Sequence, residues 1–302
     1  GRGKTKTERD VTTLEWSRDG ALLATGGMDG IARVFSKEGG LLQTLVGHSQ
    51  SIFSMRFSGD SAHLLTGSYD ASTIVWDVNT GAPRQRFEVH KGQVLDVDWR
   101  DTSTFASSSS DAQIHVCSLG RATPVRSFLG HQDEVNAVKW DPAGKLLASG
   151  SDDATVKIWS LTNESAAPVY DLRDHTKEIY TIRWAPTGEG SANPGKRPVL
   201  ASASFDATVR LWDPETGGCL HSLARHDKKV YTVAFSPCGS YLASGSLGGQ
   251  LYVWSTKDGQ VVRSFTSGGS DIFEVAWNRT GSKIACCGAM ASNAVTIMDF
   301  RM

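Results

Sequence analysis

The chain has 302 residues, with 31 basic and 32 acidic side chains and a formal net charge of −1. This balance argues against direct nucleic-acid binding, because such binding relies on many Lys and Arg contacts to phosphate. The sequence contains no run of about twenty apolar residues and no signal-peptide pattern, so we expect no membrane partner. Its 5 cysteines are scattered without a CxxC pair, which favours free thiols in a reducing compartment.

Taken in chain order, the sequence repeats one unit seven times. A clear copy is GHQDEVNAVKWDPAGKLLASGSDDATVKIWS at 130–160, which returns in modified form at 225–255. The final aromatic position recurs about every 42 residues, apart from one longer unit with a polar insertion at 187–198. We therefore expect residues 11–302 to form one repeat array, preceded by a linker or closing strand at 1–10. The recurring position is occupied by Phe35, Trp76, Cys117, Trp159, Trp212, Trp254 and Met298.

Each unit has the pattern of four short strands. In the fourth unit these are EVNAVKW at 134–140, LLASGS at 146–151, TVKIWS at 155–160 and a weaker run within 167–175. Turn residues separate the runs, and no helical period persists. Apolar residues occupy both faces of a strand, which predicts sheets packed face to face. The fold class is predicted to be all-β, a β-propeller with seven repeats visible.

The last unit differs from the others because it ends without a fourth strand. A closed propeller needs an outer strand in every blade, and 1–10 has no apolar side chain to supply one. We therefore favour a piece of an eight-bladed ring over a ring that closes with seven.

Four residues recur in register and look like a Ser/His/Asp catalytic triad with an added Trp. A hydrolase would carry one copy of such a triad, whereas here the set repeats and loses members in some units. Cys117 replaces the Trp in the third unit, and Gly248 replaces the Asp in the sixth. We therefore predict a buried structural hydrogen-bond chain. The complete sets are His48, Thr66, Asp70, Trp76; His131, Ser149, Asp153, Trp159; and His175, Ser202, Asp206, Trp212.

Other signals of chemistry are weak. Residues 3–5 read Gly-Lys-Thr, but no glycine stands at the upstream distance that a phosphate-binding loop requires. No Cys/His spacing typical of a metal site occurs. The sequence therefore predicts a protein that is not an enzyme, with no catalytic residue, metal or cofactor.

Aromatic and acidic residues recur at the positions that a propeller projects onto one rim. Such a rim would bind a peptide rich in Lys and Arg, with aromatic anchors and attracting carboxylates, although Lys228 and Lys229 interrupt the acidic series. In the alternative interpretation, the aromatics fill the central channel and the acids are solvated turn residues. The predicted peptide-binding residues are Phe53, Tyr69, Glu134, Asp152, Glu178, Tyr180, Phe205, Tyr231, Asp271 and Phe273.

Several stretches resemble the WD-repeat half of the transducin beta-like proteins. They include DVTTLEW at 10–16, HTKEIYTIRWAPTG at 175–188 and LASASFDATVRLWD at 200–213, and the C-terminal IMDFRM is similar to the plant-lineage member. The resemblance implies a nuclear corepressor scaffold that acts with histone deacetylases and contacts histone tails. It also implies an eighth repeat. A competing class is the substrate receptor of a ubiquitin ligase, using the same rim.

Overall fold

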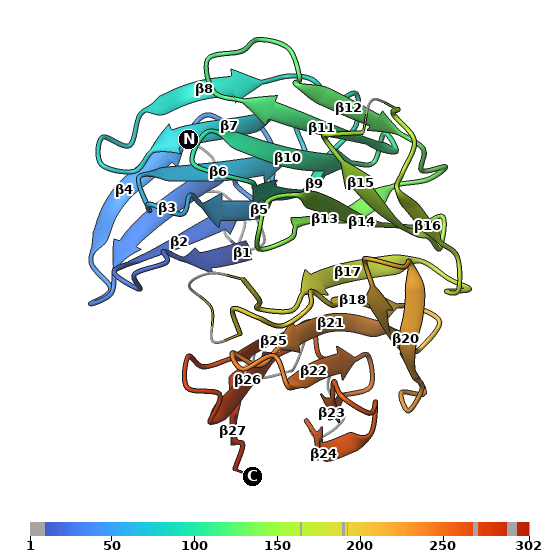
Figure 1. Cartoon of the computed structure of the whole chain (residues 1–302). Helices are drawn as coiled ribbons and strands as arrows, with labels where there is room; N and C mark the ends of the chain where they lie inside the picture. Colours follow the sequence, from blue (N-terminus) through green and yellow to red (C-terminus); the bar gives the residue numbers. More distant parts are fainter. Residues whose placement is uncertain are drawn as a thin grey trace. The chain divides into compact units, whose positions relative to one another are not determined.

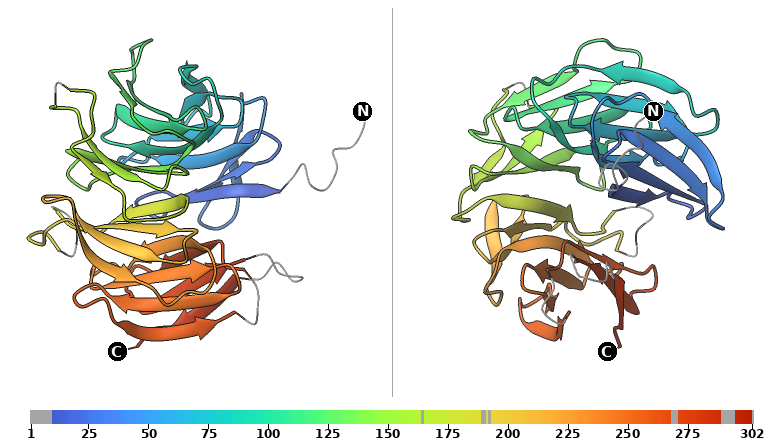
Figure 2. Two further views of the ribbon diagram at one scale, coloured as in Figure 1. Left: turned by 90° about the vertical axis from the view of Figure 1, so that its right-hand side faces the viewer. Right: turned by 180° about the vertical axis from the view of Figure 1, so that it is seen from behind.

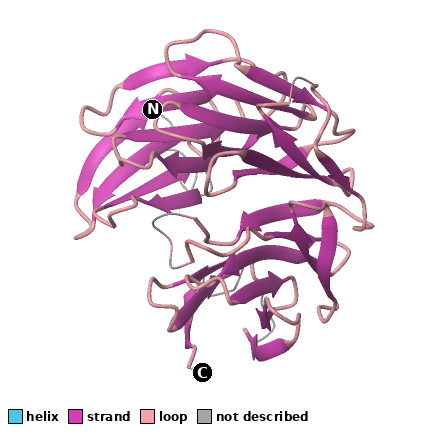
Figure 3. Ribbon diagram, viewed as in Figure 1, coloured by secondary structure: helices cyan, strands magenta, loops and turns pink. Residues whose placement is uncertain are grey.

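The structure, a computed structural model, describes residues 10–163, 165–188, 191, 193–267, 271–288 and 295–301. The predicted linker or closing strand at 1–10 therefore lies outside the described residues, except for Asp10. Every regular element in the described ranges is a β-strand, as Figure 3 shows. No helix there is long and apolar enough to cross a membrane.

The chain folds as two compact units (Figure 1). Unit 1 comprises Gly1–Trp140 with Leu161–Ala167, and unit 2 comprises Asp141–Ser160 with Pro168–Met302. The strands of unit 1 are β1 (Val11–Trp16), β2 (Leu22–Gly27), β3 (Ile31–Ser36), β4 (Leu41–Val46), β5 (Ile52–Phe57), β6 (His63–Ser68), β7 (Thr73–Asp77), β8 (Pro83–Phe87), β9 (Val94–Trp99), β10 (Thr104–Ser109), β11 (Gln113–Ser118), β12 (Arg126–Leu129) and β13 (Val135–Trp140).

Unit 2 continues the same repeat. Its strands are β14 (Leu146–Ser151), β15 (Val156–Ser160), β16 (Tyr170–Leu172), β17 (Ile179–Trp184), β18 (Leu200–Ser204), β19 (Val209–Asp213), β20 (Gly218–Leu223), β21 (Val230–Phe235), β22 (Tyr241–Ser246), β23 (Gln250–Ser255), β24 (Val261–Thr266), β25 (Glu274–Trp277), β26 (Lys283–Cys287) and β27 (Val295–Asp299).

Consecutive strands form antiparallel meanders, each of which is one blade. The described residues give seven sheets, ordered β1-β2-β3-β4, β5-β6-β7-β8, β9-β10-β11-β12, β13-β14-β15-β16, β17-β18-β19-β20, β21-β22-β23-β24 and β25-β26-β27. The predicted all-β repeat is confirmed, including the three strands of the last unit. The prediction of an eight-bladed ring gains no support from these seven sheets.

Apolar side chains on both faces of the strands are buried between neighbouring sheets, as predicted. In unit 1, Ala24 and Val34 of the first sheet share a cluster with Met55 and Trp76 of the second. In unit 2, Leu211 of the fifth sheet packs in one cluster with Val233 of the sixth. The blades are therefore held together mainly by apolar burial, which contributes about 25 cal/mol per Å² removed from water.

The first strand of each blade is its inner strand, and neighbouring inner strands also form hydrogen bonds. Within unit 1, β5 lies beside β9 and β9 beside β13 (Figures 1 and 2). The Ser54 hydroxyl of β5 accepts the Val97 N–H of β9 at 3.3 Å, and the Asp96 carboxylate of β9 accepts the Val138 N–H of β13 at 3.0 Å. In unit 2, Thr232 of β21 accepts the Val275 N–H of β25 at 3.3 Å in the same way.

A chain of charged groups crosses the inner strands of unit 1. The buried Asp96 carboxylate pairs with the ammonium of Lys139, which is also buried. Nearby, Arg56 donates to Glu15 at 3.0 Å and lies 3.8 Å from Asp98. Burial raises the pKa of Asp98. The pKa of Asp96 is lowered, because the positive charges of Lys139 and Arg56 outweigh the effect of burial. The alternation of sign allows these groups to be buried.

In the first five blades, the turn between the second and third strands imposes an unusual backbone conformation. Ala71, Ala112, Ala154 and Ala207 follow the turn Asp and have φ between 63° and 66°. Gly30 occupies this position in the first blade with φ 73°. A Cβ at Gly30 would meet the His48 carbonyl oxygen at 2.9 Å, so glycine is required there.

Candidate peptide-binding surface

The His, Ser or Thr, Asp and Trp set, which we call the blade tetrad, forms a hydrogen-bonded chain inside a blade. In the second blade His48 Nδ1 lies 3.0 Å from the Asp70 carboxylate, and His48 Nε2 lies 2.8 Å from the Thr66 hydroxyl. That hydroxyl also accepts the Trp76 indole N–H at 2.9 Å. The side chain of His48 is 0% exposed and Thr66 is fully buried, so no substrate reaches the hydroxyl. These contacts form the buried hydrogen-bond chain that the sequence predicts.

The fifth blade has the same chain. His175 lies 2.8 Å from both Asp206 and Ser202, and Trp212 donates to Ser202 at 2.8 Å. In the fourth blade Trp159 donates to Ser149 at 2.8 Å, Asp153 caps its own turn through Thr155, and His131 is buried.

Hydrogen bonds set the ionisation of the tetrad carboxylates. Burial alone would raise the pKa of Asp70, but hydrogen bonds from His48 and Ser72 outweigh it and hold that pKa well below its usual range. Asp206 behaves alike, with burial opposed by His175 and Thr208. These carboxylates are therefore charged at neutral pH, and their oxygens accept hydrogen bonds within the blade.

The third blade departs from the tetrad at its final position. Cys117 is buried where the Trp stands elsewhere, and burial raises the pKa of its thiol to about 12. His90 keeps its contacts with Asp111 at 3.1 Å and Ser107 at 2.8 Å. His115 packs on His90 with ring centroids 4.5 Å apart. Ser107 therefore receives no indole N–H.

One cluster in the described residues has the side chains for a metal. One donor atom each of His90, Asp111 and His115 lie within 4.8 Å of one another, and His115 Nε2 is buried without a hydrogen-bond partner. Two of the three residues, however, already form the tetrad pair that occurs in blades without a third ligand. The cluster is explained as a variant tetrad, and the expectation of a metal-free protein stays a prediction.

The sixth blade lacks the tetrad Asp and uses a different turn. Gly248 has φ 94°, and its N–H donates to the Asp271 carboxylate at 2.7 Å. Asp271 was predicted to bind peptide, and the structure gives one of its oxygens this turn contact. His226 Nε2 lies 2.7 Å from the Ser244 hydroxyl, as in the other tetrads, but His226 Nδ1 is buried without a hydrogen-bond partner. Burial lowers the pKa of His226 to about 4.

Four of the predicted rim aromatics form one cluster in unit 2, which we call the aromatic cluster: Tyr180, Phe205, Tyr231 and Phe273. The ring centroid of Tyr231 lies 4.1 Å from that of Tyr180, 5.4 Å from that of Phe205 and 5.1 Å from that of Phe273. Tyr180 is 41% exposed and Phe273 38%, although both are large apolar groups. Packed but accessible rings are typical of interface anchors.

Bulges in the inner strands direct two of these rings outward. The β17–β18 register shifts between Ile179 and Thr181, and the β21–β22 register shifts at the equivalent place around Tyr231. A bulge adds an unpaired residue and redirects its side chain. Ile179 before the bulge is fully buried while Tyr180 is exposed.

Three of the predicted binding residues lie in unit 1. Phe53 lies at the corresponding bulge of β5, and its ring centroid is 5.5 Å from that of Tyr69. Both side chains are 41% exposed. Glu134 is half-buried just before β13.

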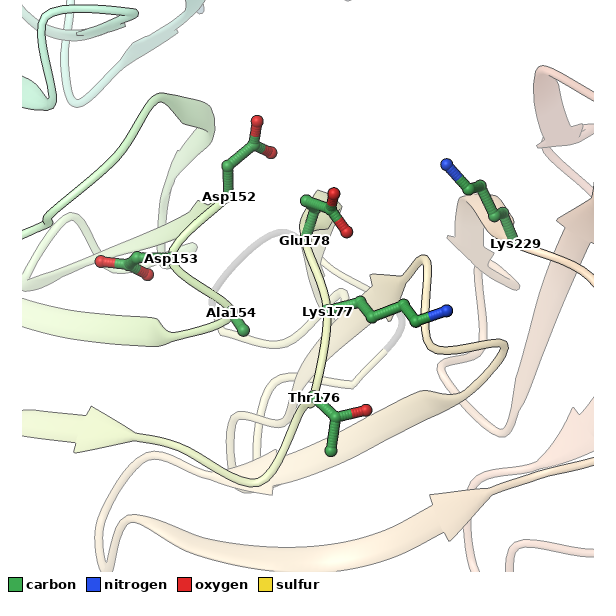
Figure 4. Close-up of a pocket in the computed structure, with 7 residues that line it drawn as sticks. All are labelled: Asp152, Asp153, Ala154, Thr176, Lys177, Glu178 and Lys229. Carbon is green, nitrogen blue, oxygen red and sulfur yellow. The ribbon is translucent and has the colours of Figure 1, made fainter.

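A pocket of about 480 Å³ lies beside the aromatic cluster (Figure 4). Its lining residues are Asp152, Asp153, Ala154, Thr176, Lys177, Glu178 and Lys229. The carboxylates of Asp152 and Glu178 face the same side, and Lys229 stands across from them. The Glu178 carbonyl accepts the Phe205 N–H at 2.9 Å, which joins pocket and cluster.

Two lysines of this site were not among the predicted binding residues. Lys177 lines the pocket, and Lys229 places its ammonium 4.2 Å from the Phe205 ring centroid. The one signal visible from the sequence is the interruption of the acidic series at Lys228 and Lys229. It did not show that Lys229 covers a predicted anchor.

The blades and their tetrads define a WD-repeat β-propeller protein. The model of the family "WD domain, G-beta repeat" matches residues 3–36, 39–77, 81–118, 122–160, 166–213 and 217–255, and the chain belongs to this family. The crystal structure of the C-terminal WD40 domain of Sif2 is similar with a TM-score of 0.84 and 26% identity, over 97% of this chain and 82% of that one.

Within the family, the resemblance to transducin beta-like proteins is confirmed. The chain is 50% identical to the F-box-like/WD repeat-containing protein TBL1X of Mus musculus over 78% of its own length and 44% of that protein. It is 52% identical to the WD40 repeat-containing protein HOS15 of Arabidopsis thaliana over 97% of its own length and 47% of that protein. The chain thus spans less than half the length of these two relatives.

Proposed function

We propose that the protein is a non-enzymatic scaffold of a nuclear corepressor assembly, in which it binds basic peptides such as histone tails and contacts histone deacetylase and corepressor subunits. The observation that carries the peptide-binding part is the aromatic cluster beside the carboxylates of Asp152 and Glu178. Aromatic rings hold the aliphatic stems of Lys and Arg, and carboxylates attract their charged ends. The assembly rests on the similarity to TBL1X and HOS15, and on a relative named as SIR4-interacting protein.

A second candidate is a substrate receptor of a ubiquitin ligase. TBL1X is named an F-box-like/WD repeat-containing protein, which favours this alternative for that protein. The same surface of this chain would then select targets for degradation. An acidic or phosphorylated target fits poorly, because Asp152 and Glu178 would repel it.

The test is a fluorescence-anisotropy titration of fluorescent histone-tail peptides, unmodified and lysine-acetylated, at low and moderate salt. We expect the unmodified peptide to bind more tightly, and its affinity to fall as salt rises. Tyr180→Ala should weaken binding by about 1–2 kcal/mol, since it removes an exposed anchor. The double variant Asp152→Asn/Glu178→Gln should weaken binding and reduce the dependence on salt.

Matched controls separate the site from general effects. Leu220 is 47% exposed on the outer strand β20, so Leu220→Ala removes a comparable apolar side chain outside the cluster. Glu215→Gln removes an exposed carboxylate in the same unit. Equal losses in Tyr180→Ala and Leu220→Ala, at unchanged thermal stability, would place the peptide elsewhere. Tighter binding of a phosphorylated, acidic peptide would favour the second candidate.

A further inference from the structure

Lys229 occupies the place where the proposed function puts a cation of the partner. The residue comes just before β21, and its backbone is fixed because its carbonyl accepts the Leu247 N–H at 2.9 Å. From there the side chain reaches back over Phe205, with Nζ 4.2 Å from the ring centroid. It also lines the pocket that holds Asp152 and Glu178. The surface therefore already contains a lysine ammonium on an aromatic face beside two carboxylates.

The contact that holds Lys229 is a weak one. Within the described part of the chain its ammonium forms no ion pair, and the residue is exposed. In the same described residues, the side chain of Lys229 contacts the ring of Phe205. A cation on an exposed aromatic face gains little, because water competes for the charge. Lys229 is therefore easily displaced, although its flexible stem covers the ring until that happens.

We propose that Lys229 is an internal occupant of the binding surface, and that a lysine side chain of the partner replaces it on Phe205. This inference rests on the proposed function and adds the ligand group and the residue that controls access. A free lysine of the partner can make the same cation–π contact, with Asp152 and Glu178 supplying the attraction. Lys229 lowers the affinity in two ways, since it covers the ring and adds a repelling charge.

The test compares two neighbouring lysines. Lys228 is exposed and is not a lining residue of the pocket, so Lys228→Ala removes the same charge without uncovering Phe205. Lys229→Ala should bind the unmodified histone-tail peptide about two- to five-fold more tightly than the wild type, the equivalent of one exposed cation–π contact. Lys228→Ala should give a smaller gain that disappears at high salt, because only long-range repulsion is removed.

Modified peptides test whether the incoming group is a cation. Lysine acetylation removes the charge, so the gain of Lys229→Ala over Lys228→Ala should vanish with the acetylated peptide. Trimethylation keeps the charge and suits an aromatic face, so the gain should persist. A gain of equal size with the acetylated peptide would mean that Lys229 blocks the surface only by its bulk, and would overturn the inference.

The remaining outcomes separate the inference from the proposed function. If the wild type binds and Lys229→Ala behaves like Lys228→Ala, the inference that Lys229 is an internal occupant is wrong, while the proposed peptide-binding function is retained. If Lys229→Ala binds more weakly, Lys229 is itself a contact for the ligand, which also overturns the inference. If neither the wild type nor either variant binds any peptide, both proposals fail.

A direct readout comes from NMR of the protein labelled in its lysines. Phe205 should shift the ε-methylene protons of Lys229 upfield by its ring current, and Lys229→Arg assigns the signal. Addition of the unmodified peptide should return this signal toward the position of an exposed lysine. An unshifted signal in the free protein, or one that peptide leaves in place at saturation, would contradict displacement.

Discussion

The contribution of the Trp indole to a blade tetrad can be measured by comparing two blades of unit 1. Thr66→Val keeps the size of the side chain but removes the hydroxyl that joins His48 to Trp76. It leaves a buried indole N–H and a buried imidazole nitrogen without partners. Each orphaned group costs about 1–3 kcal/mol, so the free energy of unfolding should fall by about 2–6 kcal/mol.

The third blade provides the control, because it has Cys117 in place of the Trp. Ser107→Ala leaves only the imidazole nitrogen of His90 unpaired, so the free energy of unfolding should fall by about 1–3 kcal/mol. Urea denaturation followed by circular dichroism measures both losses. Equal losses in the two variants, or a loss below about 1 kcal/mol for Thr66→Val, would refute the claim that the indole bond stabilises the blade.

Three further predictions concern pH, turn strain and buried charge. The pKa of His226 is about 4 in the fold and 6.5 in the unfolded chain, so between these pH values the unfolded state binds more protons. The free energy of unfolding should therefore fall by up to about 1.4 kcal/mol per pH unit as the pH drops through this range. In denaturation experiments at several pH values, His226→Gln should show a flatter dependence of this free energy on pH. Ala71→Gly should raise the free energy of unfolding by about 0.5–1 kcal/mol, because glycine adopts a positive φ without strain. Gly30→Ala at the equivalent turn should lower the free energy of unfolding by more than about 2 kcal/mol. Melting temperatures of the two variants that move in the same direction would contradict this account. Lys139→Met should lower the free energy of unfolding by about 3–5 kcal/mol, because it leaves the buried Asp96 carboxylate without its partner. The double variant Lys139→Met/Asp96→Leu should recover much of that loss in calorimetry. A double variant as unstable as the single one would show that the ion pair itself stabilises the fold.

The repeat could be predicted because it is written in residue identities at a fixed period. Trp76, His48 and Asp70 are found by spacing alone, since every complete blade must place them alike to satisfy buried hydrogen bonds. Cys117 and Gly248 were found for the same reason, as departures from a known register. The number of strands in each blade follows from the same pattern.

The candidate surface was only partly predictable, because it depends on contacts between positions that the period does not relate. The exposure of Tyr180 comes from a bulge, which only the pairing of β17 with β18 reveals. The position of Lys229 over Phe205 depends on the direction of one long side chain. One carboxylate oxygen of Asp271 accepts the Gly248 N–H, a contact between residues 23 positions apart that the repeat does not indicate. The ion pair of Asp96 and Lys139 joins residues 43 positions apart.

The hydrogen bonds between inner strands make the stability of the fold depend on the order of the blades. Ser54 of the second blade accepts an N–H of the third, and Asp96 of the third blade accepts an N–H of the fourth, so these two blades each carry the acceptor for the blade that follows. A blade moved to another place in the chain would bring an acceptor shaped for the wrong neighbour. Successful shuffling or transplantation of these repeats therefore requires exchanging adjacent pairs, with the junction between them kept intact.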